Sequence, residues 1–206
     1  TFNMVNKQLA LTLEDQRSPS LSEQSLQDFI ISGRTAIGRT KVSAPLQILL
    51  DGGYLTGPGT LLHYGKGRTT LDSPAMEEVG LTVFDYDYVH CPAPELLGSS
   101  YSLVFCCYVV NTLPKGSRAH VYRQLAYACG GTVFIAARSD RIKGTPEPDN
   151  DGVRTSKGTF QKSYQSGELK AEAGQYFDIV ENIKAKQGIS IVACRRPKKL
   201  GILTLV

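Results

Sequence analysis

Two glycines with basic neighbours follow a short apolar segment, and this combination could hold a ligand. Residues 61–64 lead directly into Gly65-Lys66-Gly67-Arg68. Glycines let a backbone approach a ligand closely, and the N-terminus of a following helix offers free N–H groups. Asp85 comes roughly 20 residues later, where open α/β sheets place a carboxylate that binds both ribose hydroxyls of a nucleotide-like ligand. Together these features predict a site for a nucleotide-like cofactor.

A second group of candidate site residues ends the apolar run 103–110. It contains Cys106, Cys107 and Tyr108, which we expect to line the crevice beyond the carboxyl end of a strand. Free cysteine is a common buried residue, and no basic residue close in sequence would favour a thiolate. We therefore expect these thiols to pack around a ligand and not to act as nucleophiles.

The elements that must position these residues alternate between strands and helices. Short apolar runs predict strands at residues 60–64, 81–86, 103–110, 132–137, 176–184 and 189–194. Stretches with one apolar face predict helices at residues 21–33, 43–52, 71–79, 118–128 and 167–173. This order is typical of an α/β fold with a parallel sheet, and the short connection at 186–188 makes the last two strands antiparallel. The polar segment 138–157 is expected to be a long loop.

Charge and composition narrow the possible partners. The net charge of +4 permits an anionic partner without requiring one. Basic residues cluster at 195–199 and at Arg34, Arg39 and Lys41. No apolar run approaches the roughly 18 residues of a membrane span. The first residues are mostly polar, so we expect no secretion signal. With an odd number of cysteines, two of them in an apolar run, we expect reduced thiols, a cytoplasmic protein and no membrane partner.

The order of these motifs resembles the class I S-adenosylmethionine-dependent methyltransferases. The segments that carry the resemblance are residues 62–68, 84–87 and 101–114. Arg34-Thr35-Ala36-Ile37 and Gly158-Thr159-Phe160-Gln161-Lys162 are similar to a narrower group, the methyltransferases found beside bacterial DNA phosphorothioation systems. The resemblance covers roughly residues 34–195. It implies a Rossmann-like, seven-stranded sheet, mostly parallel with an antiparallel last strand, and helices on both faces.

The resemblance also implies S-adenosylmethionine as the cofactor and no metal. The residues implied to bind the cofactor are His63, Tyr64, Gly65, Gly67, Asp85, Tyr86, Cys106, Cys107 and Tyr108. In this scheme the glycines face the methionine part, Asp85 holds the ribose and Tyr86 flanks the adenine. Methyl transfer is an in-line displacement, so the protein mainly positions the acceptor and removes a proton. Candidates for these tasks are Tyr108, His90 and Lys162.

Two positions depart from the pattern of the class. His63 stands where an acidic residue usually anchors the cationic methionine end, and Thr69 replaces the third glycine. We expect these changes to weaken cofactor binding. The leading expectation is a methyltransferase acting on nucleic acid or a nucleotide-like acceptor. The alternative is a degenerate methyltransferase fold that serves as a non-catalytic binding subunit for a nucleic acid or protein partner.

The remaining patterns concern other activities and the domain boundaries. The Asp/Asn-Pro-Pro-aromatic motif of amino-group nucleic-acid methyltransferases is absent, which argues against N6-adenine and N4-cytosine methylation. A dinucleotide enzyme fits less well, because Gly-x-Gly-x-x-Gly would need a glycine at Thr70.

We expect a peripheral arm at 1–33, a methyltransferase-like domain at 34–196 and a tail at 197–206.

Overall fold

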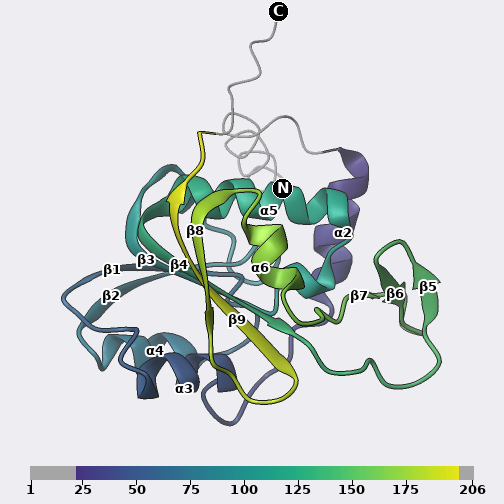
Figure 1. Ribbon diagram of the computed structural model, residues 1–206, viewed down its shortest axis with the longest axis horizontal. Coiled ribbons are helices and arrows are strands. Elements are labelled where there is room, and N and C mark those ends of the chain that lie inside the picture. The colour runs from purple at the N-terminus through teal and green to yellow at the C-terminus, as the bar shows by residue number, and fades with distance from the viewer. Residues whose placement is uncertain (1–21, 200–206) are drawn as a thin grey trace, which may run out of the picture.

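A mixed sheet forms the centre of the protein, and helices cover both of its faces (Figure 1). The computed structural model describes residues 22–199. Within these residues the sheet has the strands β1 (Gly59–Tyr64), β2 (Leu81–Tyr86), β3 (Tyr101–Cys107), β4 (Cys129–Arg138), β8 (Phe177–Ile183) and β9 (Ile189–Pro197). Their order is β2-β1-β3-β4-β9-β8, and β9 runs antiparallel to both of its neighbours. The expected α/β class with an antiparallel last strand is confirmed.

The sheet has six strands among the described residues, so the implied seven are wrong. The returning segment between β2 and β3 forms no further strand. It contains only the isolated bridge between Asp87 and Cys91 and the 3-10 helix η1 (Pro94–Gly98). The third strand is also shorter than expected, because the chain turns at Tyr108 and enters the 3-10 helix η2 (Val110–Thr112).

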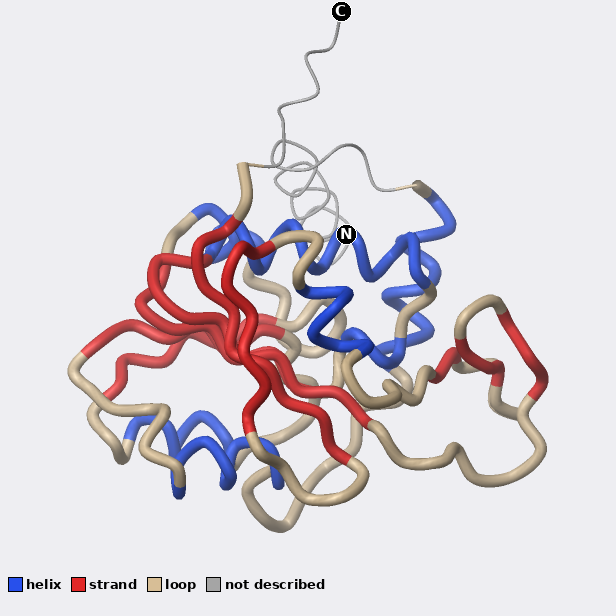
Figure 2. The backbone as a smooth tube through the Cα atoms, viewed as in Figure 1, coloured by secondary structure: helices blue, strands red, loops and turns tan. Residues whose placement is uncertain are grey.

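Alternating side chains along the strands build a separate core on each face of the sheet. One face is covered by α2 (Glu23–Gly33), α5 (Lys115–Ala128) and α6 (Glu168–Ala173), and the other by α3 (Ala44–Asp51) and α4 (Asp72–Glu77) (Figure 2). On β1, Leu62 belongs to the core under α5, whereas its neighbour Leu61 packs with Leu46 of α3 and Met76 of α4. Each face therefore buries one half of every central strand.

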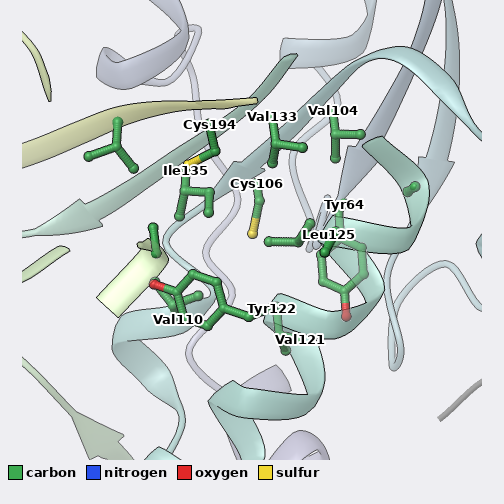
Figure 3. Packing of buried hydrophobic residues seen from close by; sticks show 14 of the residues in the cluster. Tyr64, Val104, Cys106, Val110, Val121, Tyr122, Leu125, Val133, Ile135 and Cys194 are labelled. Carbon is green, nitrogen blue, oxygen red and sulfur yellow. The ribbon is translucent and has the colours of Figure 1, made fainter. Parts of the chain in front are cut away.

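Cys106 belongs to the core under α5. Figure 3 shows it among the packed side chains of Tyr64, Val104, Val110, Val121, Tyr122, Leu125, Val133, Ile135 and Cys194. Its side chain is fully buried, and burial raises the pKa of its thiol well above the ordinary value. The expectation that Cys106 lines the ligand crevice is therefore wrong, because the alternation along β3 turns it away from that crevice.

The segment expected as a long loop instead contains a hairpin. β5 (Glu147–Asp149) and β6 (Gly152–Arg154) pair antiparallel, and β7 (Phe160–Gln161) extends them into a small sheet. This sheet projects from the body of the protein beside α6 (Figure 1).

A buried arginine attaches this hairpin to the core. Arg118 of α5 is 1 % exposed and donates to the Asp151 carboxylate at the hairpin turn. Its Nε donates to Oε1 of Glu172 in α6 at 2.9 Å, and its Nη1 to the carbonyl of Leu113 at 2.8 Å. One side chain thus joins α5, α6 and the hairpin.

The helix α2 joins the core and is not detached from it. Phe29 packs in the cluster under α5, and the Ser117 hydroxyl of α5 donates to the buried Asp28 carboxylate at 2.8 Å. The expected arm at 1–33 therefore ends in a packed helix, while residues 1–21 and 200–206 lie outside the described part of the chain. No helix between residues 22 and 199 has the length and apolar character needed to cross a membrane.

Candidate functional site

A pocket of about 720 Å³ opens at the carboxyl ends of β1, β2 and β3. The chain passes from β1 to β2 on one side and then crosses to β3 on the other side of β1, so the order of strands reverses between β1 and β3. Open α/β sheets bind ligands in the crevice at this reversal. Residues of the last turn of α2 and of the segment 35–39 that follows it also line this pocket.

The glycine turn after β1 is held against its neighbours. The N–H groups of Gly65 and Lys66 donate to the Tyr86 carbonyl at 2.7 and 3.1 Å. Gly65 has φ +73°, and a Cβ there would overlap the side chain of Val109. Only glycine therefore fits this turn without strain, which brings the backbone to the edge of the pocket.

The carboxylate beside this turn is Asp87, which corrects the expected assignment of Asp85 to the site. Asp87 lines the pocket, and its Oδ2 accepts from the Gly67 N–H at 2.8 Å. Its Oδ1 accepts from the N–H groups of Val89 and His90 at 2.9 and 2.8 Å. Asp85 does not line the pocket. β2 ends at Tyr86, so Asp85 still lies within the strand, where its carboxylate accepts from Ser73 of α4, whereas Asp87 lies beyond the end of the strand.

Asp85 instead holds His63 in place. The two residues pair across β1 and β2, and His63 Nδ1 lies 3.2 Å from Asp85 Oδ1. Ser73 of α4 donates to the same oxygen at 2.5 Å, and Lys66 Nζ lies 3.3 Å from Oδ2. Burial alone would raise the pKa of Asp85, but the hydrogen bonds of His63 and Ser73 and the nearby positive charge lower it to about 2. Asp85 is therefore a charged residue outside the pocket lining that holds the pocket residue His63 in place.

The acid stability of the protein should depend on Asp85. Its folded pKa of about 2 lies below the ordinary 3.8, so its contribution is complete above pH 4 and is lost as the pH falls towards 2. Two pKa units correspond to about 3 kcal/mol, which partial exposure reduces to about 1–2 kcal/mol. We expect Asp85→Asn to lower the free energy of unfolding by that amount at pH 7. Its decline between pH 4 and pH 2 should also be shallower than that of wild type.

Urea unfolding at a series of pH values measures this difference. The exposed Asp51, which accepts from Gln47 Nε2 at 2.7 Å, provides the matched control Asp51→Asn. An equally steep acid decline in Asp85→Asn and wild type would contradict the prediction.

Among the three candidates for positioning or proton removal, Tyr108 is the one that lines the pocket in the described chain. It is held at φ 57°, an unusual angle for a residue other than glycine, and its N–H donates to the Ala136 carbonyl at 2.8 Å. The Arg39 guanidinium lies 5.5 Å from its ring centroid. Burial raises the pKa of Tyr108 to about 12. At neutral pH this hydroxyl can donate a hydrogen bond but cannot act as a base.

The other two candidates lie outside the pocket, which corrects their expected role. His90 is exposed, and its Nε2 lies 2.9 Å from the Gly33 carbonyl. Lys162 Nζ lies 3.5 Å from Asp151 and 3.6 Å from Glu168, so it belongs to the ion pairs that hold the hairpin. Both residues connect elements that are distant in sequence, which a single sequence does not show.

The remaining residues predicted to bind the cofactor lie at the pocket, and their contact with a cofactor stays a prediction. The predicted residues that line the pocket are His63, Tyr64, Gly65, Gly67, Tyr86, Cys107 and Tyr108. Cys107 is a weak nucleophile there, because burial raises the pKa of its thiol far above the ordinary value.

Sequence reasoning missed a polar wall on the far side of the pocket. Arg138 Nη1 and Asn111 Nδ2 approach Gln161 Oε1 at 3.4 and 3.5 Å, and all three side chains line the pocket. Arginine only donates, so the oxygen of Gln161 must face it, and the amide nitrogen of Asn111 must face that oxygen. The Asn111 Oδ1 is consequently left buried without a partner. The signals in the sequence were the position of Asn111 past a strand end and the place of Gln161 in the segment 158–162 of the narrower resemblance.

Several solved structures have an architecture similar to that of this chain. The 1,6-didemethyltoxoflavin-N1-methyltransferase of Burkholderia thailandensis superposes with a TM-score of 0.60 over 88 % of this chain and 93 % of that one, at 14 % identity. The PH0226 protein of Pyrococcus horikoshii OT3 superposes with a TM-score of 0.56 over 74 % of this chain and 90 % of that one, at 12 % identity. A Rhodobacter sphaeroides structure whose description names zinc-dependent alcohol dehydrogenases superposes with a TM-score of 0.58. The match covers 85 % of this chain and 100 % of that one, at 10 % identity.

The chain has the Rossmann-like methyltransferase fold. At identities of 10–14 % these similarities show the fold alone, so the activity must be argued from the residues of the site. No protein-family model matches the sequence, and a search of curated proteins finds no match either.

Proposed function

We propose that this protein is an S-adenosylmethionine-dependent methyltransferase that binds its cofactor in the pocket lined by the glycine turn and Asp87. The observation that carries the proposal is the pocket at the reversal of strand order, with a carboxylate at the end of β2 next to Gly67. Its volume of about 720 Å³ lies within the range of about 300–1,000 Å³ of small-molecule sites. The Burkholderia thailandensis neighbour, which has the same fold, is described with bound S-adenosylhomocysteine.

The residues present fit the parts of this cofactor. Asp87 would accept from the ribose hydroxyls, as a strand-end carboxylate does in other open α/β sheets. The backbone of Gly65 and Gly67 would lie against the chain that joins ribose and sulfur, with no side chain between. When bound, the cofactor supplies a methyl group already activated by a sulfonium charge. The protein then has to orient the acceptor, exclude water and accept a proton.

The acceptor would lie against the polar wall formed by Asn111, Gln161 and Arg138. The buried, unpartnered Asn111 Oδ1 needs an N–H or O–H donor, because leaving it unpaired costs about 1–3 kcal/mol. The protonated Tyr108 hydroxyl can donate to a carbonyl or ring nitrogen. These groups suit a nucleotide-like or other small heterocyclic acceptor. The narrower resemblance to phosphorothioation-associated methyltransferases also supports a nucleotide-like or nucleic-acid acceptor.

Titration of the protein with S-adenosylmethionine and S-adenosylhomocysteine tests the proposal. We expect wild type to bind both, and Asp87→Ala to bind them tenfold to a hundredfold more weakly. This range corresponds to the roughly 1.5–3 kcal/mol of hydrogen bonds to a charged group. Circular dichroism should show that the variant is folded. Asp149→Ala is the matched control, since Asp149 pairs with Arg154 in the hairpin and does not line the pocket.

Absence of binding at millimolar ligand would contradict the proposal. It would favour the second candidate, a degenerate methyltransferase fold that acts as a binding subunit. The feature that favours this alternative is His63, which occupies the position of an expected acidic residue.

A further inference from the structure

A buried carboxylate without an ionic partner lines the pocket. Asp72 is 2 % exposed and begins α4 at the side of the pocket that faces α3. Its Oδ1 accepts from the Ser43 N–H at 2.8 Å. Within residues 22–199 no lysine, arginine or histidine forms an ion pair with it. Buried carboxylates are costly unless they are paired, so this one calls for a cation.

A second unsatisfied group lies beside it. The Ser43 side chain is 1 % exposed and lines the same pocket, and among the described residues its Oγ has no nitrogen or oxygen partner and contacts only the weakly hydrogen-bonding thiol of Cys107. Arg39, a basic residue of this wall, places its guanidinium over the Tyr108 ring instead. A buried carboxylate without an ion pair and a neighbouring buried hydroxyl without a nitrogen or oxygen partner point to a ligand group in this corner.

His63 supplies a third acceptor nearby. Its Nδ1 lies 2.9 Å from the hydroxyl of Ser73, the residue that follows Asp72. Asp85 can only accept, and Ser73 gives its own proton to Asp85, so Nδ1 must carry the ring proton. In the neutral ring Nε2 then has a free lone pair, and His63 lines the pocket.

We infer that Asp72, Ser43 and His63 form a subsite for a primary ammonium group of the ligand. An ammonium group has three N–H donors, and these residues offer a carboxylate, a hydroxyl and an imidazole nitrogen. A sulfonium has no N–H and would leave the Ser43 hydroxyl unsatisfied. The inference rests on the proposed function, in which the ligand's ammonium belongs to the methionine end of the cofactor. Asp72 thus provides the negative charge that position 63 lacks.

The test compares two neutral-sulfur ligands that differ in the ammonium-bearing part. S-adenosylhomocysteine carries it, and 5′-methylthioadenosine keeps the adenosine and the thioether but lacks it. We expect Asp72→Asn to bind S-adenosylhomocysteine tenfold to a hundredfold more weakly and 5′-methylthioadenosine as well as wild type does. Asp28→Asn is the matched control, since Asp28 is also a buried aspartate but does not line the pocket, and it should change neither affinity.

Three binding results would overturn the inference. They are an equal loss for both ligands, no loss for either, and a loss for S-adenosylmethionine without one for S-adenosylhomocysteine, which would place Asp72 at the sulfonium.

If wild type binds none of these ligands, the proposed function fails, and the ligand-free protein decides about the subsite. Asparagine keeps the acceptor for Ser43 N–H but removes the unpaired charge. A subsite for an amine then predicts that Asp72→Asn melts about 2–4 °C higher than wild type. A lower melting temperature would show a structural role for the charge and overturn the inference.

Discussion

Replacing Arg118 by leucine should lower the free energy of unfolding by about 3–5 kcal/mol, the cost of breaking a buried ion pair from one side. Arg118 is 1 % exposed and is bound by Asp151, Glu172 and the Leu113 carbonyl. Leucine fills part of the volume but leaves these acceptors without their donor. Urea unfolding measures the loss.

A more exposed ion pair in the same region provides the control. Arg154 pairs with Asp149 at 2.8 Å but is 34 % exposed, so Arg154→Leu should cost less than about 1 kcal/mol. Trypsin should also cut Arg118→Leu at Lys157 sooner than it cuts wild type, because the hairpin loses its attachment to α5. Equal losses in the two variants would show that the buried network contributes no more than a surface pair.

Gly65→Ala should be the most damaging single change at the pocket. Alanine at φ +73° costs about 1–2 kcal/mol, and overlap with the Val109 side chain adds about 1–3 kcal/mol. We expect a loss of about 2–5 kcal/mol in unfolding free energy, together with loss of cofactor binding, because the turn must shift away from β3.

Two further variants separate these causes. Gly53 has φ +67° with open space around its Cα, so Gly53→Ala should show the backbone cost alone. Adding Val109→Ala to Gly65→Ala removes the overlapping methyl groups and should restore part of the lost stability. If the double variant is no more stable than Gly65→Ala, the overlap is not the cause.

The alternation of strands and helices was predictable because it depends on local patterns. Apolar runs and helix-ending glycines predicted the six strands of the sheet and the helices between them to within a few residues. The antiparallel last strand followed from the short connection at 186–188. The hairpin at 147–154 was missed although Asp149-Asn150-Asp151-Gly152 is a turn signal, and Asn150 indeed has φ 51°.

The site residues were harder to assign because their roles depend on one-residue boundaries and on distant partners. Asp85 and Asp87 are two residues apart and chemically identical, and only the end of β2 at Tyr86 separates a buried anchor from a pocket residue. Asp72 carried no local signal at all. Its burial beside Ser43 arises because the starts of α3 and α4 meet, which no sequence pattern announces.

The position of β9 has a consequence for synthesis of the protein. β9 is the last described strand along the chain, yet it lies inside the sheet between β4 and β8. On the ribosome, one side of β4 therefore stays an open edge until residues 189–197 have emerged. A nascent chain stalled before that point exposes an apolar strand whose partner does not yet exist. Folding of the sheet is thus completed after translation of β9, and stop codons that truncate the chain before residue 189 should yield aggregating products.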